Sequence, residues 1–228
     1  MKVKNINLIC TVLMVLIIFT FSSVFASGFP GKTYYTKTNI WYEKTNDILS
    51  TNYHRGNILP IGTKVIIHSI EDRKIHFTPV GSGEMFTIIN HKKTSIISTD
   101  RLFNRYFSTE EVKPGDGDYY QATEADLENI KKGVIAVGMS KKAVIMAYGY
   151  PPAHKTPRLS SDIWYYWYAR LHKVNVYFKK DKVFKIETIG PAPYPGILRS
   201  DVDETGGTKK DKIKEKKLKI EENYEDEL

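Results

Sequence analysis

The chain has 228 residues, of which 41% are hydrophobic and 26% are charged, and its formal net charge is +8. This balance is typical of a globular protein and excludes a disordered chain or a membrane protein with several spans. The single cysteine, Cys10, lies in the first apolar run, so the rest of the chain has no thiol nucleophile, disulfide or cysteine-based metal site. Because a glycine-rich phosphate loop and an HExxH motif are also absent, the sequence favours a protein that is not an enzyme.

Residues 1–26 have the pattern of a secretory signal peptide. Two lysines precede an apolar run over residues 8–21, and Val24-Phe25-Ala26 offers small residues where signal peptidase cleaves. The alternative is an uncleaved anchor in the inner membrane, because the apolar segment is just long enough to span it. Cys10 precedes most of this run and follows a bulky residue, which disfavours lipidation. We expect an exported protein of the periplasm or the periphery of the outer membrane.

Two breaks in composition divide the rest of the chain. Pro114-Gly115-Asp116-Gly117-Asp118 neither continues a helix nor fills a strand, and residues 190–196 form a second stretch rich in proline and glycine. The tail that follows has a basic block, then an acidic block, and too few apolar residues to bury, which predicts disorder. The predicted organisation is a signal peptide (1–26), a first domain (32–107), a linker (108–119), a second domain (120–188) and a charged tail (190–228).

The first domain is predicted to consist of short strands. Thr33–Glu43 is rich in β-branched and aromatic residues, Leu59–Ile67 is a turn leading into a strand, and Lys74–Thr78 and Met85–Ile89 are two further strands. Several short strands in one small domain favour a barrel. The Leu59–Ile67 segment resembles bacterial SH3-like modules, and this resemblance implies an SH3-like β-barrel that binds cell-wall peptide or other proteins.

A hairpin and a closing helix complete this domain. A tight turn at residues 71–73 predicts a register in which His68 lies opposite His76 on the outer face. Two imidazoles leave a divalent ion short of ligands, so solvated histidines are favoured over a metal site. Residues 98–107 predict a helix capped by Ser98 or Thr99. The side chains expected in the core are those of Val65, Ile67, Ile75, Phe77, Leu102, Phe103 and Tyr106, with Trp41 and Tyr42 more typical of core than of an exposed platform.

The second domain begins with two predicted helices. Thr123 offers a hydroxyl cap to the first, which Gly133 weakens at its end. Ser140 offers a cap to the second, and Met139 before it is placed to pack on Val144. Gly149 ends this second helix, because glycine adopts a left-handed conformation without penalty and the two prolines that follow cannot continue it.

Three predicted strands follow, over Asp162–Ala169, Leu171–Phe178 and Val183–Thr188. Two helices followed by an antiparallel meander predict an α+β, two-layer sandwich. In the second strand Val174, Val176 and Phe178 share one face, which we expect to cover the helices. The opposite face carries some of the five consecutive aromatic residues 164–168.

The order of these motifs resembles the SmpA/OmlA (BamE-like) family. The residues that carry the resemblance are Gly133, Gly138-Met139-Ser140-Lys141 with Val144, Gly149-Tyr150-Pro151 and Trp164-Tyr165-Tyr166-Trp167. The resemblance covers residues 120–188 and implies a helix–helix–three-strand fold. It also implies a non-enzymatic accessory role in the assembly machinery of the outer membrane, with contacts to other subunits and to anionic lipid. The family's lipidated cysteine is absent here, and its pattern does not include the first domain.

We expect the binding surface of such a module to be the aromatic strand and the neighbouring 151–157 loop, rimmed by lysines. The predicted interaction residues are Tyr150, Pro151, Trp164, Tyr166, Trp167, Tyr168, Lys141, Lys142 and Lys173. The predicted partners are envelope proteins, including outer-membrane assembly machinery. The sequence implies no cofactor and no metal.

The distribution of charge along the chain points to an alternative function. Residues 119–198 carry 12 basic and 6 acidic side chains, whereas residues 27–118 carry 12 and 10, so the positive charge lies mainly on the second domain. A basic surface attracts anionic partners. The alternative function is therefore a cell-wall (peptidoglycan) or anionic-lipid binding module that uses the SH3-like domain and the lysine-rich face. Nucleic acid is disfavoured by the compartment. An enzyme would depend on His154, for which no serine or carboxylate spacing supports catalysis.

Overall fold

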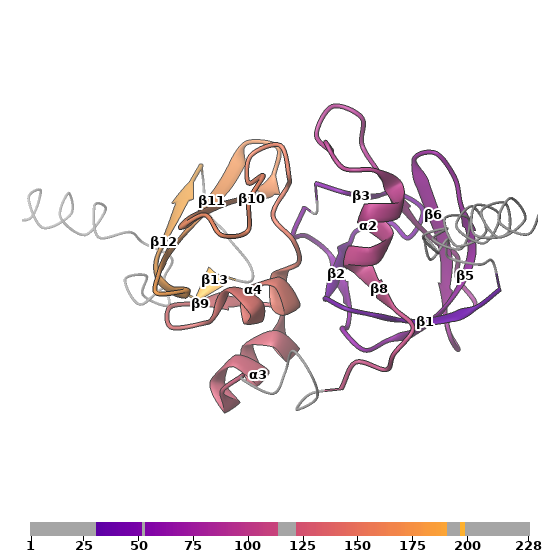
Figure 1. The fold of residues 1–228 in the computed structure, drawn as a ribbon, viewed down its shortest axis with the longest axis horizontal. Helices are drawn as coiled ribbons and strands as arrows, with labels where there is room; N and C mark the ends of the chain where they lie inside the picture. Colours follow the sequence, from indigo (N-terminus) through magenta and orange to yellow (C-terminus); the bar gives the residue numbers. More distant parts are fainter. Residues whose placement is uncertain (1–30, 52, 114–121, 191–196, 199–228) are drawn as a thin grey trace, which may run out of the picture.

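The described part of the chain is a mixed α+β structure, which confirms the predicted class (Figure 1). It is a computed structural model that describes residues 31–51, 53–113, 122–190 and 197–198. The predicted signal peptide, much of the predicted linker and nearly all of the predicted tail lie outside these residues. Across the described ranges, no helix is long and apolar enough to cross a membrane.

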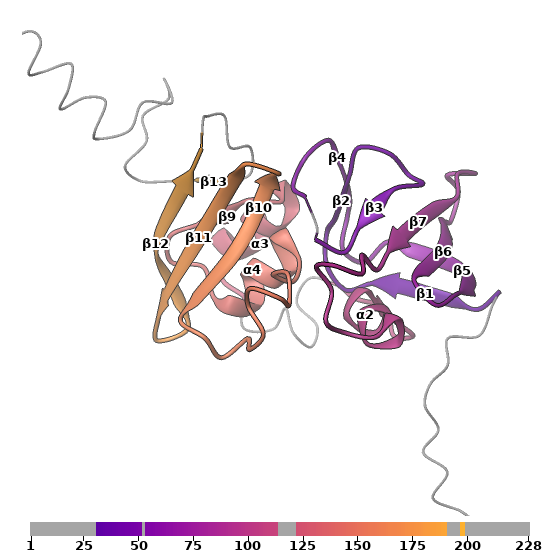
Figure 2. The same ribbon diagram turned by 90° about the horizontal axis from the view of Figure 1, so that it is seen from above.

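A curled six-stranded sheet forms the first domain. Its strands in spatial order are β3 (Ile48–Leu49), β7 (Phe86–Ile89), β6 (Lys74–Pro79), β5 (Lys64–Ile70), β1 (Thr33–Thr36) and β8 (Phe107–Ser108). The predicted first strand is divided into β1 and β2 (Ile40–Tyr42), and β2 pairs with β4 (Asn57–Leu59) outside this sheet. Helix α2 (Thr99–Tyr106) packs against the curled sheet (Figure 2).

The predicted core of this domain is confirmed, but the hairpin register is not. The strand residues Val65, Ile67, Ile75 and Phe77 are fully buried, and so are the three apolar residues of α2. A bulge between Ile67 and Ser69 places Ser69, and not His68, opposite His76. Each histidine instead contacts a threonine hydroxyl on the neighbouring strand, His68 to Thr78 at 2.8 Å and His76 to Thr87 at 3.0 Å.

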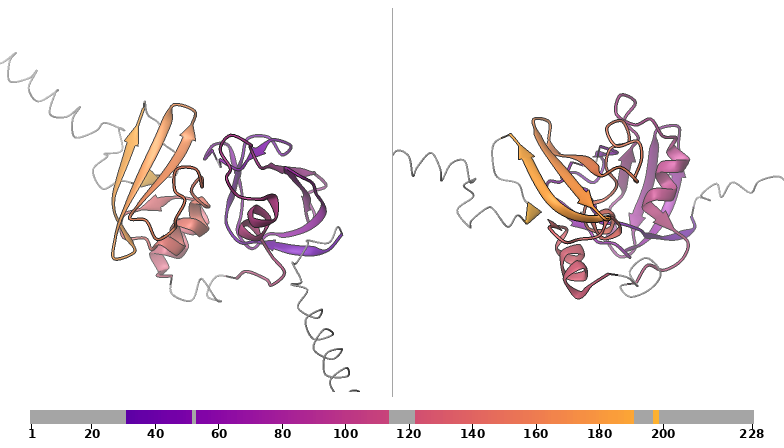
Figure 3. Two further views of the ribbon diagram at one scale, coloured as in Figure 1. Left: turned by 45° about the horizontal axis from the view of Figure 1, so that its top comes forward. Right: turned by 60° about the vertical axis from the view of Figure 1, so that its left-hand side comes forward.

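The second domain has the predicted order of helices and strands. Helices α3 (Glu124–Lys132) and α4 (Lys141–Tyr148) cover one face of an antiparallel sheet, β10 (Ile163–Ala169), β11 (His172–Lys179) and β12 (Lys182–Ile189). Figure 3 shows the two layers. Two short strands that the sequence does not predict, β9 (Ile135–Ala136) and β13 (Ile197–Leu198), form a parallel pair.

The predicted caps are present. Thr123 and Asp126 form a reciprocal capping box at the start of α3, and the Ser140 hydroxyl accepts a hydrogen bond from the Ala143 amide at 3.1 Å. Gly133 ends α3 in the left-handed conformation, with φ of 66°. Gly149 has a positive φ of 82°, but its ψ of 178° differs from the left-handed helical value that we expected.

Each domain has its own hydrophobic core, but the two domains make contacts that the sequence does not predict. Trp41, on β2, packs into the hydrophobic core of the second domain, where its ring meets Tyr148 edge-on at 6.1 Å. The Asn39 side-chain amide donates to the carbonyl oxygens of Ile130, at 2.7 Å, and Ala147, at 3.1 Å. A Cβ at Gly133 would lie only 3.0 Å from Trp41 and would collide with Ile58. We call this contact region, formed by Asn39, Trp41 and His54 with their partners, the domain joint.

Candidate functional site

The outer face of the β10–β12 sheet carries three rows of side chains, set by strand register. Because side chains alternate across a strand, every second residue of each strand points away from the helices. The row nearest the end of β12 holds Trp167, Lys173 and Ile189. The central row holds Tyr165, Asn175 and Glu187, and the third holds Ile163, Tyr177 and Lys185.

These rows border a pocket of about 400 Å³. Its lining combines aromatic rings with two lysines, so it offers both apolar surface and positive charge. Tyr165 is 37% exposed and Ile189 is 46% exposed, so both offer large side chains to a ligand in this pocket. We call it the outer-face pocket, and its lining residues are Lys155, Tyr165, Tyr166, Trp167, Lys173, Asn175 and Ile189.

Two of the predicted interaction residues are core residues. Trp164 and Tyr166 are fully buried, because they lie opposite Val176 and Val174 on the face that packs against the helices. The Tyr166 hydroxyl donates a hydrogen bond to the Gly149 carbonyl at 3.0 Å, so its ring is held on the helix side of the sheet, although Tyr166 is also among the residues that line the pocket. The prediction that Trp164 and Tyr166 form a binding surface must therefore be corrected to a role in packing.

Two more predicted residues lie between the domains. Pro151 is buried, and the Arg105 guanidinium of α2 lies 4.8 Å from the centre of the Tyr150 ring. The loop after them packs along β10, where the Thr156 hydroxyl accepts a hydrogen bond from the Tyr165 amide at 3.1 Å. In this loop, Lys155 remains exposed and reaches the outer-face pocket. Tyr150 and Pro151 are thus contacts of the domain interface and not of a free surface.

The predicted lysines have different environments. The Lys141 ammonium group lies 2.9 Å from Asp181 and 5.3 Å from the centre of the Phe178 ring, and its side chain is only 12% exposed. It therefore holds the start of α4 to the β11–β12 turn. Lys142 is exposed on α4 and does not line the pocket. Lys173 is exposed, lines the pocket and has no ion-pair partner among the described residues.

Trp167 and Tyr168 each stack on a histidine. His154 stacks on the Trp167 ring, with ring centres 5.6 Å apart, and Tyr168 stacks on His172 at 5.9 Å. Trp167 and Lys173 are therefore brought together as predicted, with Tyr168 beside Trp167 along β10. Lys155 and Tyr165 lie in the loop and the strand that were predicted to form the surface, although neither was singled out. Asn175 and Ile189 were missed, because the signal that identifies them is cross-strand register, which the pattern of one strand does not contain.

A hydrogen-bonded group of polar side chains borders the pocket. Glu187 accepts hydrogen bonds from the Tyr177 hydroxyl at 2.7 Å and from the Asn175 amide at 3.3 Å. The bond from Tyr177 lowers the pKa of Glu187 and raises the pKa of Tyr177. Glu187 is thus held as an anion by its neighbours on the sheet. Lys155 and Lys173 are the groups in the pocket that are left to attract a ligand.

Beneath this surface, a buried histidine lies against the Trp167 backbone. His54 is fully buried in the domain joint, stacks on Tyr148 with ring centres 3.4 Å apart, and faces the carbonyl oxygens of Tyr148 at 2.5 Å and Trp167 at 3.2 Å. Burial lowers its pKa from 6.5 to about 3, so the ring is neutral near neutral pH and has one N–H to donate. The sequence analysis did not identify His54, since nothing around it in the chain marks it.

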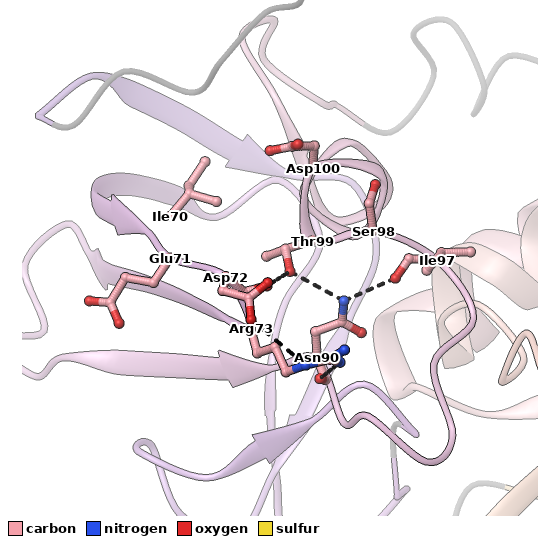
Figure 4. Close-up of a pocket in the computed structure, with 9 residues that line it drawn as sticks. All are labelled: Ile70, Glu71, Asp72, Arg73, Asn90, Ile97, Ser98, Thr99 and Asp100. Atoms are coloured by element: carbon pink, nitrogen blue, oxygen red, sulfur yellow. Dashed lines mark hydrogen bonds and ion pairs between the residues drawn. The ribbon is translucent and has the colours of Figure 1, made fainter.

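The second hollow lies on the first domain, beside the start of α2 (Figure 4). Its volume is about 370 Å³. Asn90 lies at its inner end: its side-chain amide donates to the Thr99 hydroxyl at 3.2 Å, and Arg73 donates to its backbone carbonyl at 3.1 Å, while its side-chain oxygen is buried without a hydrogen-bond partner among the described residues. The carboxylates that line it are those of Glu71, Asp72 and Asp100. This hollow is therefore unfavourable for the anionic ligands that the alternative function requires.

Within the described ranges, no three His, Cys, Asp or Glu side chains gather as a metal site would require. Comparison of the chain with known protein families, curated proteins and solved structures finds no match.

Proposed function

We propose that this chain is a non-catalytic binding module of the cell envelope, and that the outer-face pocket of the β10–β12 sheet contacts a partner protein. The observation that carries the proposal is that the exposed Tyr165 and Ile189 and the half-buried Trp167 line one pocket with Lys155 and Lys173, two lysines that have no ion-pair partner among the described residues. Aromatic anchors with a charged rim are typical of protein interfaces. A catalytic role would need a nucleophile with a base beside it. The Tyr177 hydroxyl and the Glu187 carboxylate form such a pair on this face, but neither residue lines the pocket.

The arrangement of the second domain supports a BamE-like assignment. Two capped helices lie over a three-stranded antiparallel sheet, in the order that the Gly138-Met139-Ser140 and Gly149-Tyr150-Pro151 motifs imply. A role beside the outer-membrane assembly machinery follows from that resemblance, and export follows from the predicted signal peptide. The curled sheet of the first domain is likewise compatible with the proposed SH3-like module. Its part in binding is to support the second domain through the domain joint.

The test is capture of partners from an envelope extract by the purified full chain. The variant Trp167→Ala removes an aromatic ring of the surface, and the proposal requires at least a tenfold loss of the captured partner. The matched control is Ile96→Ala, which truncates another exposed apolar side chain, 67% exposed, on the first domain. Thermal unfolding of both variants establishes that each is folded. Equal capture by Trp167→Ala and the parent chain would refute the proposed surface.

Anionic vesicles and purified peptidoglycan, added as competitors, separate the two functions. If the surface binds protein, neither competitor displaces the partner. Displacement by vesicles that disappears at high salt would instead favour the lipid-binding alternative, because screening weakens a lysine-dependent contact.

A further inference from the structure

The outer-face pocket has a chemical complement within the same chain. Residues 221–228 (Glu-Glu-Asn-Tyr-Glu-Asp-Glu-Leu) contain five carboxylates, no basic residue and one aromatic residue, Tyr224. The pocket has the opposite pattern, with the aromatic rings of Tyr165 and Trp167 beside the ammonium groups of Lys155 and Lys173. We propose that the acidic segment 221–228 binds in the outer-face pocket of its own chain and competes there with the partner protein.

Both the local charges in the pocket and the net charge of the second domain favour binding of the acidic segment. Neither Lys155 nor Lys173 has an ion-pair partner among the described residues, whereas Lys141 is held by Asp181 and Lys185 lies 3.8 Å from Glu187. Over a longer range, the 12 basic and 6 acidic residues of positions 119–198 give this part of the chain a charge that attracts a segment of −5. The acidic hollow of the first domain repels the same segment.

The chain is long enough for this contact. The segment follows Leu198 of β13 by 22 residues, which span at most about 75 Å when fully extended. A folded chain of the described size has a radius of gyration of roughly 15 Å, so the linker does not limit access to the pocket. Tethering also gives a segment an effective concentration near the millimolar range. A contact that is weak between separate molecules is therefore well populated within one chain.

The inference rests on the proposed function only in that both use the outer-face pocket. The acidic segment would regulate partner binding, since a partner must displace this segment before the partner reaches Trp167. Neutralising the segment would then strengthen partner capture without any change in the pocket. Occupancy by the segment is measurable in the purified chain without a partner, so the two proposals can fail separately.

The first experiment is zero-length carbodiimide cross-linking of the full chain, with the products located by mass spectrometry. We expect isopeptide bonds from Lys155 or Lys173 to carboxylates of residues 221–228, within a monomer. Mixing isotopically light and heavy chains distinguishes bonds within one chain from bonds between chains. Cross-links that join two chains, or that join the acidic segment only to lysines 209–219, would overturn the inference.

The second experiment measures acrylamide quenching of tryptophan fluorescence. Trp41 and Trp164 are buried, so the accessible signal comes from Trp167. A variant with the five carboxylates neutralised (E221Q, E222Q, E225Q, D226N and E227Q) is expected to raise the quenching constant at least twofold. Lys155→Gln with Lys173→Gln should give the same rise. The matched control is Lys92→Gln with Lys93→Gln, which removes the same charge from an exposed loop of the first domain and should leave quenching unchanged. Equal quenching in all of these proteins would refute the contact.

Discussion

The buried His54 makes the stability of this protein depend on pH in a defined direction. Its pKa is lowered from 6.5 to about 3 in the folded chain, because burial penalises the charged ring. The unfolded chain therefore binds the extra proton in the window between these values. The contribution of neutral His54 to the free energy of unfolding is complete above pH 6.5. As the pH falls toward 3, this contribution decreases by about 1.4 kcal/mol per pH unit.

The measurement is urea unfolding at several pH values. Between pH 6.5 and pH 5, where few carboxylates titrate, the parent chain should lose about 2 kcal/mol of its free energy of unfolding. The variant His54→Gln should be less stable at pH 7, by about 2–4 kcal/mol, because it loses the stacking on Tyr148 and one carbonyl contact. It should also show little dependence on pH in this window.

The control for this prediction is His91→Gln, at a half-buried loop histidine that contacts the Thr94 hydroxyl at 3.1 Å. It should keep the pH dependence of the parent chain. If His54→Gln has the same slope as the parent between pH 6.5 and pH 5, the argument from burial is refuted.

Two further predictions concern the domain joint. Gly133→Ala should lower the free energy of unfolding by about 2–4 kcal/mol, because it adds a collision with the other domain to the cost of a positive φ. The control Gly81→Ala has a similar φ and open space around its Cβ, so it should cost about 1–2 kcal/mol, and equal losses would contradict the predicted collision. Asn39→Ala should cost about 2–4 kcal/mol in urea unfolding, since the Ala147 carbonyl loses its Asn39 donor and the Ile61 amide loses its Asn39 acceptor, while the Ile130 carbonyl keeps the Gly133 amide. A loss below 1 kcal/mol would show that the joint does not depend on this amide.

Much of the local structure follows from sequence patterns that operate over a few residues. The hydroxyl caps at Ser98, Thr123 and Ser140 each lie directly before an apolar stripe, and all three accept the expected amide hydrogen bond. The alternation of Val174, Val176 and Phe178 likewise fixes which face of β11 is buried. These features depend on near neighbours in the chain and were predicted correctly.

The site itself was predicted only in part, because its geometry depends on pairing between strands. Five aromatic residues in succession give no polar position from which to decide which face is buried. Only the register that places Trp164 opposite Val176 turns Tyr165 and Trp167 outward. The bulge at His68 shows the same limit, since one extra residue changes a register that the alternation alone predicts.

The domain joint was not predicted, because its contacts join residues far apart in the chain. The amide of Asn39 and the ring of His54 contact carbonyl groups about 90 to 110 positions away, and such groups are present at every residue. Two domains were therefore predicted without the contacts that join them. Trp41 was correctly predicted to be buried, but it lies in the core of the other domain.

The most direct test of the central proposal is photo-cross-linking in the native envelope. A photoreactive phenylalanine derivative at position 165 places the reactive group on the outer-face pocket, and the same group at position 96 provides an exposed control on the first domain. The account predicts a discrete cross-linked product with one partner protein from position 165 and none from position 96. No product from position 165, or the same products from both positions, would contradict binding through this face.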